Sequence, residues 1–139
     1  MRWALEDAAD GSWWQSAQTP ENLDLLARND VEFKRHLDRC KYPERHGLAL
    51  ADREVERDTA TQALLVPLDA RLQSQPYLGG GTPCATDLAI FPFVRQFAAV
   101  DARWFEAQNL PALQAWLAAW LSSALFAACM VKLTAHTEL

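Results

Sequence analysis

Apolar residues recur along this chain at helical spacing, and Pro and Gly mark the boundaries of the helices that this spacing predicts. The first helix is predicted to begin at Thr19, whose side chain can accept a bond from a free N–H group, with Pro20 at the first helical position. We expect the Asn29-Asp30 pair to bend or break this helix and the turn at 41–47 to end it. Its apolar stripe consists of Leu23, Leu26, Phe33, Leu37 and Cys40.

Three further helices follow from the same reasoning. A helix over 52–75 is predicted to kink at Pro67, because proline lacks an N–H donor. A glycine-rich connector then leads into residues 84–97, which are apolar on nearly every side, as a central buried helix is. Asn109 is expected to cap a last helix, in which leucine repeats every four residues from Leu113. No segment alternates with period two, so the predicted fold is all-α with no sheet.

Composition and charge narrow the class of protein. The 139 residues are 50% hydrophobic, which suits one globular domain, and the net charge of -5 argues against a nucleic-acid partner. Three widely separated cysteines give no disulfide framework, and acidic residues follow the N-terminal Met too soon for a secretory signal, so we expect a cytoplasmic protein.

A membrane-spanning helix is the alternative for one stretch of the chain. Residues 107–131 carry no charged side chain and are numerous enough to cross a bilayer. However, the stretch is rich in Ala and holds Trp116 and Trp120 near its middle, whereas membrane Trp prefers the water boundary. We therefore expect a buried helix and no membrane partner.

Residues 77–97 carry a motif at the start of the predicted central helix. They read Y-L-G-G-G-T-P-C-A-T-D-L-A-I-F-P-F-V-R-Q-F, and this stretch resembles the C-terminal helical domain of the glutathione S-transferase family. The family has Ser or Thr where Cys84 stands, and Asp87 matches its acidic residue. The stretches at 41–45, 113–120 and 126–130 also resemble the family, and the resemblance covers roughly residues 15–135. It implies an all-α helical bundle of this type with no sheet.

The resemblance also implies a domain organisation. Residues 1–14 look like the end of the last helix of a thioredoxin-like domain plus a linker, and residues 15–139 look like the helical domain. Family enzymes bind glutathione and activate its thiol in the thioredoxin-like domain, which these residues lack, so we expect a truncated form that is inactive alone and binds no cofactor alone. In the complete enzyme glutathione is the co-substrate, the helical domain lines the pocket for a hydrophobic electrophile, and the role is detoxification by a homodimer.

Cys84 and Asp87 also have a role that elementary chemistry predicts. A buried helix start cannot leave its first N–H groups unpaired, and a carboxylate three residues into the helix can satisfy one. A thiol at the cap could instead be a nucleophile favoured by the helix dipole, but burial and Asp87 oppose the thiolate. We therefore assign both residues to a structural helix cap.

Other candidate site residues follow from position. By analogy with the family, Tyr42 and Arg95 are candidates for the substrate pocket, and Arg95 needs a partner or a cleft because it lies in an apolar helix. His36, Cys40 and His46 form an alternative metal site, but Cys40 belongs to the apolar stripe and a fourth ligand is missing. We therefore predict no metal and no catalytic residue in this chain. The alternative function is a non-catalytic helical module for protein–protein interaction.

Overall fold

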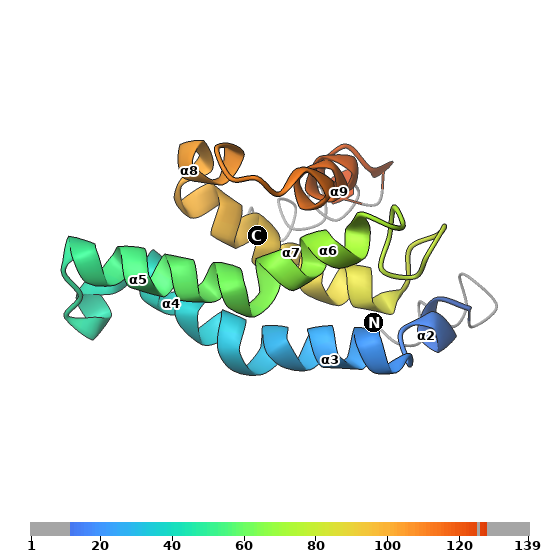
Figure 1. The fold of residues 1–139 in the computed structure, drawn as a ribbon, viewed down its shortest axis with the longest axis horizontal. Helices are drawn as coiled ribbons and strands as arrows, with labels where there is room; N and C mark the ends of the chain where they lie inside the picture. Colours follow the sequence, from blue (N-terminus) through green and yellow to red (C-terminus); the bar gives the residue numbers. More distant parts are fainter. Residues whose placement is uncertain (1–11, 125, 128–139) are drawn as a thin grey trace, which may run out of the picture.

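Two long bent helical segments form one side of the molecule, and we call residues 20–41 the first rod and residues 50–72 the second rod. The structure is a computed structural model that describes residues 12–124, 126 and 127, so most of the expected remnant at 1–14 lies outside the described residues. The first rod follows the short helix α2, and the second rod runs back alongside the first (Figure 1). The helical elements up to the end of the second rod are α2 (Ser12–Ser16), α3 (Pro20–Arg28), η1 (Asn29–Phe33), α4 (Lys34–Lys41), η2 (Pro43–His46), α5 (Leu50–Ala60), η3 (Thr61–Leu65) and α6 (Val66–Leu72).

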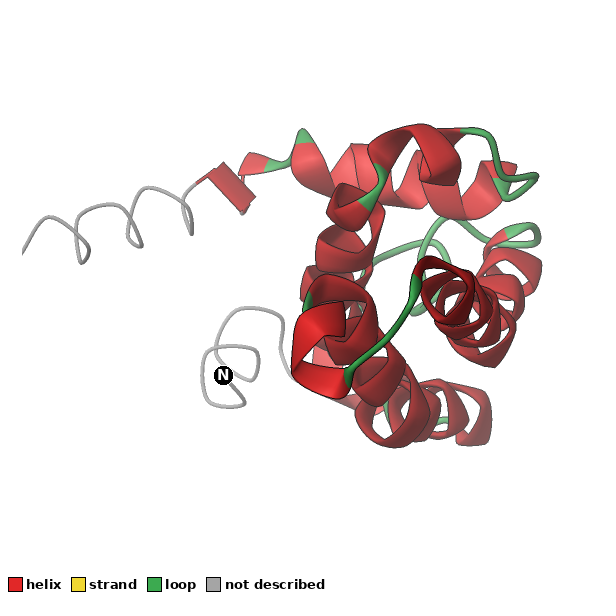
Figure 2. Cartoon of the chain, turned by 90° about the vertical axis from the view of Figure 1, so that its left-hand side faces the viewer, coloured by secondary structure: helices red, strands yellow, loops and turns green. Residues whose placement is uncertain are grey.

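A central helix and two later helices complete the described fold. Helix α7 (Ala85–Val100) packs against α3, α4, α8 and α9, and its buried face includes Ile90 and Val94, which are fully inaccessible. Helices α8 (Ala102–Glu106) and α9 (Pro111–Leu121) lie on the side of α7 away from α3 (Figure 1). The described residues contain helices and loops but no strand, with one isolated bridge between Tyr77 and Gly80 (Figure 2). The all-α prediction is confirmed.

Each rod continues through a π-helical turn where the sequence predicted a bend. The Asn29-Asp30 pair lies in η1, so the first helix changes its winding there and does not break. In the second rod η3 ends at Leu65, two residues before Pro67. Pro67 has no N–H to donate to the carbonyl of Ala63 four residues earlier, and that carbonyl accepts from Arg28 Nη1 at 3.4 Å instead. The two π turns lie against each other, so the irregularities of both rods meet at one level.

The start of α7 is organised around one buried carboxylate. Asp87 has no accessible surface, and its Oδ2 accepts from the backbone N–H of Cys84 at 2.8 Å. Its Oδ1 accepts from Leu78 N at 2.9 Å and from Trp116 Nε1 at 2.8 Å. Asp87 therefore joins the glycine-rich connector, α7 and α9 in addition to capping its own helix.

The cap of α9 differs from the prediction. Leu110, not Asn109, is the residue before the helix, and it offers no side-chain bond to the first turn. The N–H of Leu113 is satisfied by Asp69 Oδ1 of α6 at 3.0 Å, and Asp69 is itself buried. Asn109 failed as a cap because the acceptor comes from another helix, which local sequence does not reveal.

No described helix has both the length and the apolar composition that a bilayer span requires. The uncharged stretch considered for such a span contributes α9, which is only 11 residues long. Trp116 and Trp120 of α9 are buried against the aromatic ring of Phe91, as the alternative of a core helix requires.

Candidate functional site

A groove of about 190 Å³ lies between the end of the first rod and the central helix. Helix α4 and the residue after it provide one wall, and α7 provides the other. The residues that line this groove are Lys34, Leu37, Asp38, Lys41, Tyr42, Phe93 and Gln96. We call it the Tyr42 groove.

Cations lie over both aromatic rings of the Tyr42 groove. Lys34 Nζ is 4.3 Å from the ring centroid of Phe93. The ring of Tyr42 has Arg45 Cζ at 4.2 Å and Lys41 Nζ at 5.2 Å from its centroid. Such cation–π contacts hold flat rings in place and position charge beside them.

Polar contacts fix the two walls of the groove relative to each other. Lys41 Nζ donates to Gln96 Oε1 at 2.9 Å and so connects the end of α4 to α7. Asp38, the acidic lining residue, pairs with His46 Nε2 at 2.9 Å. The groove thus presents two aromatic rings, Leu37 and a basic rim, which suits a flat molecule with an apolar face better than a metal ion.

The two predicted pocket residues have different surroundings. Tyr42 lines the groove, whereas Arg95 does not, although it belongs to the same helix as Phe93 and Gln96. The Arg95 guanidinium lies over the ring of Phe126, 5.4 Å from its centroid, which supplies the partner expected for a charge in an apolar helix. Phe93 and Gln96 were missed, but their spacing of three on a helix that also carries Arg95 was a signal for a shared face.

Both described cysteines are in environments that disfavour the thiolate. Burial raises the pKa of the Cys84 thiol, and the nearby carboxylate of Asp87 raises it further. Burial also raises the pKa of Cys40, with an added contribution from Glu56. Neither thiol is therefore poised as a nucleophile. Cys129 lies outside the described residues.

We expect Cys84→Ser to raise the free energy of unfolding by about 0.5–1 kcal/mol, because a hydroxyl accepts from the first N–H groups of a helix better than a thiol does. The matched control is Cys40→Ser, which places a hydroxyl in the apolar stripe and should destabilise the chain by about 1–3 kcal/mol. Urea denaturation followed by circular dichroism measures both. A lower free energy of unfolding for Cys84→Ser would show that its side chain does not act as the cap.

The histidines considered for a metal site have carboxylate partners instead. His36 Nδ1 contacts Glu56 Oε2, and Arg39 Nε donates to Glu56 Oε1 at 2.5 Å, so this cluster connects α4 to α5. His46 pairs with Asp38. Among the described residues, no group of three or more His, Cys, Asp or Glu side chains is arranged to hold a metal ion.

The Glu56 cluster predicts a loss of stability in acid. Burial alone would raise the pKa of Glu56, but hydrogen bonds and charge from His36 and Arg39 outweigh it, so the pKa lies below the usual 4.5. The stabilisation is therefore complete above that value and is lost as the pH falls through the lowered pKa of the folded state. We expect Glu56→Gln to cost on the order of 1–2 kcal/mol at neutral pH.

Chemical denaturation across the acidic range tests this, with Glu44→Gln as the control at an exposed position. Part of the acid-induced loss of stability should disappear in Glu56→Gln and remain in Glu44→Gln. If the stability of Glu56→Gln falls with pH as steeply as that of the unmodified chain, the cluster does not contribute in this way.

The fold and the cap define a class of protein. An all-helical bundle whose central helix starts at a buried capping aspartate is the architecture expected from the family resemblance. The family model described as "Glutathione S-transferase, C-terminal domain" matches residues 55–119, which run from α5 to α9. Residues 55–119 are therefore similar to the C-terminal domain of glutathione S-transferases. No curated protein and no solved structure gave a significant match.

Proposed function

We propose that this chain supplies the hydrophobic co-substrate site of a glutathione S-transferase, with the Tyr42 groove as that site. The observation that carries the proposal is the pair of aromatic rings that line one groove, Tyr42 directly after α4 and Phe93 within α7. A flat electrophile bound there would contact both rings and Leu37 and would exclude water from its apolar face.

In this proposal, residues other than the described ones activate the thiol of glutathione. Conjugation requires glutathione as its thiolate, and an ordinary thiol needs donors or positive charge beside the sulfur to lose its proton. Neither described cysteine lines the Tyr42 groove, and burial raises the pKa of both. We therefore expect residues 1–139 alone to bind the electrophile but not to conjugate it, with glutathione entering as the co-substrate of a complete enzyme.

We also propose a cellular setting and an oligomeric state for this protein. A cytoplasmic detoxifying enzyme fits the free thiols at Cys40 and Cys84, which a reducing compartment preserves. Pairing of two copies through the two rods follows from the family resemblance.

Binding of an unreactive aryl probe tests the proposed site. We expect 1,3-dinitrobenzene, titrated into the ¹⁵N-labelled chain, to shift the amide signals of Tyr42, Phe93 and Gln96 saturably. Tyr42→Ala should weaken binding by about tenfold, and Tyr42→Phe, which keeps the ring, should leave it within about twofold. Shifts that do not saturate, or equal weakening by both variants, would contradict the proposal and favour a non-catalytic interaction module.

A further inference from the structure

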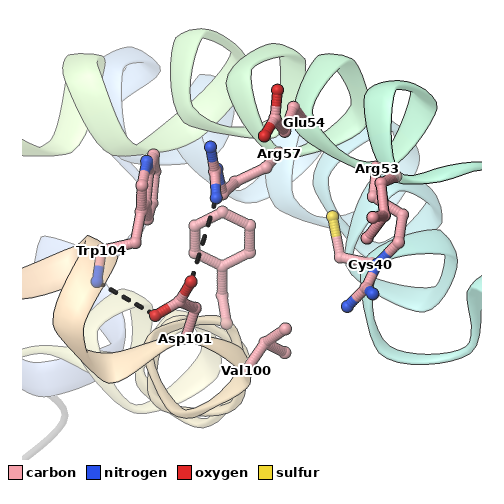
Figure 3. Close-up of a pocket in the computed structure, with 9 residues that line it drawn as sticks. Cys40, Arg53, Glu54, Arg57, Val100, Asp101 and Trp104 are labelled. Carbon is pink, nitrogen blue, oxygen red and sulfur yellow. Dashed lines mark hydrogen bonds and ion pairs between the residues drawn. The ribbon is translucent and has the colours of Figure 1, made fainter.

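A second cavity lies away from the Tyr42 groove and shares no lining residue with it. Its volume is about 230 Å³, and α5, α7 and α8 form its walls, with Cys40 of α4 at its base (Figure 3). The charged residues that line it are Arg53, Glu54, Arg57 and Asp101, and the apolar ones include Leu50, Phe97, Val100 and Trp104. We call it the arginine pocket.

The guanidinium of Arg57 is held in position, but some of its N–H groups lack a close acceptor. It lies over the indole of Trp104, 4.3 Å from the ring centroid (Figure 3). Its ion pairs are long, at 4.0 Å to Asp101 and 3.9 Å to Asp58, and its Nε is buried without a hydrogen-bond partner. A planar, oriented guanidinium with unused N–H groups is suited to donate hydrogen bonds to a carboxylate.

Arg53 adds a second cation one helical turn earlier. It lies four residues before Arg57 on α5, so both side chains extend from the same face of the helix. No hydrogen bond or ion pair joins Arg53 to another described residue, and both arginines lie close enough to Cys40 to lower the pKa of its thiol, although burial raises that pKa more.

The two acidic residues of the pocket do not neutralise these cations fully. Asp101 uses Oδ1 to accept from Trp104 N at 3.1 Å, as the cap of α8, and its side chain is 52% exposed. Glu54 is exposed and forms no ion pair within the described residues. Solvent screens exposed charges, whereas Arg57, at 26% exposure, is screened less.

The apolar residues of the lining indicate the chemistry of the part of the ligand that is not the carboxylate. Leu50 is 76% exposed and Val100 is 37% exposed, so the pocket has apolar side chains that nothing in the described structure covers. The volume lies below the roughly 300 Å³ at which drug-sized sites begin, so the ligand has one or two rings. We propose that the arginine pocket binds a small aromatic monocarboxylate, with its carboxylate on Arg53 and Arg57 and its ring against Leu50 and Val100.

Calorimetric titration of the 139-residue chain with 2-naphthoate tests this proposal, with 2-naphthamide as the uncharged probe of the same shape. We expect one saturable site with a Kd of about 0.1–1 mM, and binding of the amide at least about tenfold weaker. Arg57→Met and Arg53→Met should each weaken naphthoate binding by about tenfold or more. Arg103→Met, at an exposed position of α8 outside the pocket, and Tyr42→Ala should leave it within about twofold.

The use of two arginine variants distinguishes a loss of binding from a loss of folding. Arg57 packs against Trp104, so its variant is compared by circular dichroism first, whereas Arg53 has no such contact and its variant should fold unchanged. The proposal is overturned if naphthoate shows no saturation below about 10 mM, if the amide binds equally well, or if Arg53→Met leaves binding unchanged. Loss of binding in Tyr42→Ala would place naphthoate in the Tyr42 groove and would also overturn it.

Discussion

Asp87→Ala should lower the free energy of unfolding by about 3–5 kcal/mol, the largest effect we expect from a single polar substitution. The carboxylate has no accessible surface and accepts from Cys84 N, Leu78 N and Trp116 Nε1. Truncation leaves these three donors buried without an acceptor, and each unpaired donor costs about 1–3 kcal/mol. Urea denaturation followed by tryptophan fluorescence and circular dichroism measures the change.

A milder variant at Asp87 and a control at an exposed aspartate complete this test. Asp87→Asn keeps one acceptor oxygen and the shape of the side chain, so we expect a smaller loss of about 1–3 kcal/mol. Asp58→Ala removes a carboxylate that is 70% exposed and should change stability by less than about 0.5 kcal/mol. A loss below about 1 kcal/mol for Asp87→Ala would show that the three donors find other partners.

Phe33→Ala should cost about 3–5 kcal/mol, because it removes a fully buried ring and leaves a cavity where the two rods meet the central helix. The ring of Phe33 packs against that of Phe97 with centroids 5.3 Å apart. Val31 offers a matched control, since it lies in the same π turn but is 72% exposed. Val31→Ala should change the free energy of unfolding by less than about 0.5 kcal/mol.

Equilibrium denaturation of these two variants also tests the register of η1, because in this register Phe33 faces the core and Val31 faces solvent. Comparable losses for Phe33→Ala and Val31→Ala would contradict the placement of Phe33 in the core.

Helical periodicity predicted the parts of the fold that depend on neighbours in the sequence. Thr19 accepts from Asn22 N at 3.3 Å as the expected cap, and Leu37 and Cys40 of the apolar stripe are buried. Leu23, assigned to the same stripe, is 45% exposed, because the buried face of α3 holds Asn22 and Leu25 instead. Apolar spacing misplaces a face when one of its buried residues is polar, as Asn22 is.

The same reasoning could not predict contacts between residues that are far apart in the sequence. The acceptor for the start of α9 comes from Asp69, 44 residues before Leu113, and nothing near Asn109 indicates it. The Tyr42 groove likewise joins α4 to α7 through Lys41 and Gln96, which are 55 residues apart. The sequence identified Tyr42 through family resemblance, but the second wall of the groove required the packing of the two helices.

In the proposed function, these residues hold an apolar co-substrate site but do not activate the glutathione thiol. The initial rate of conjugation of 1-chloro-2,4-dinitrobenzene with glutathione, measured with and without the purified 139-residue chain, tests it most directly. We predict that the rate with the chain equals the uncatalysed rate. A rate that rises in proportion to the concentration of the chain would contradict the account.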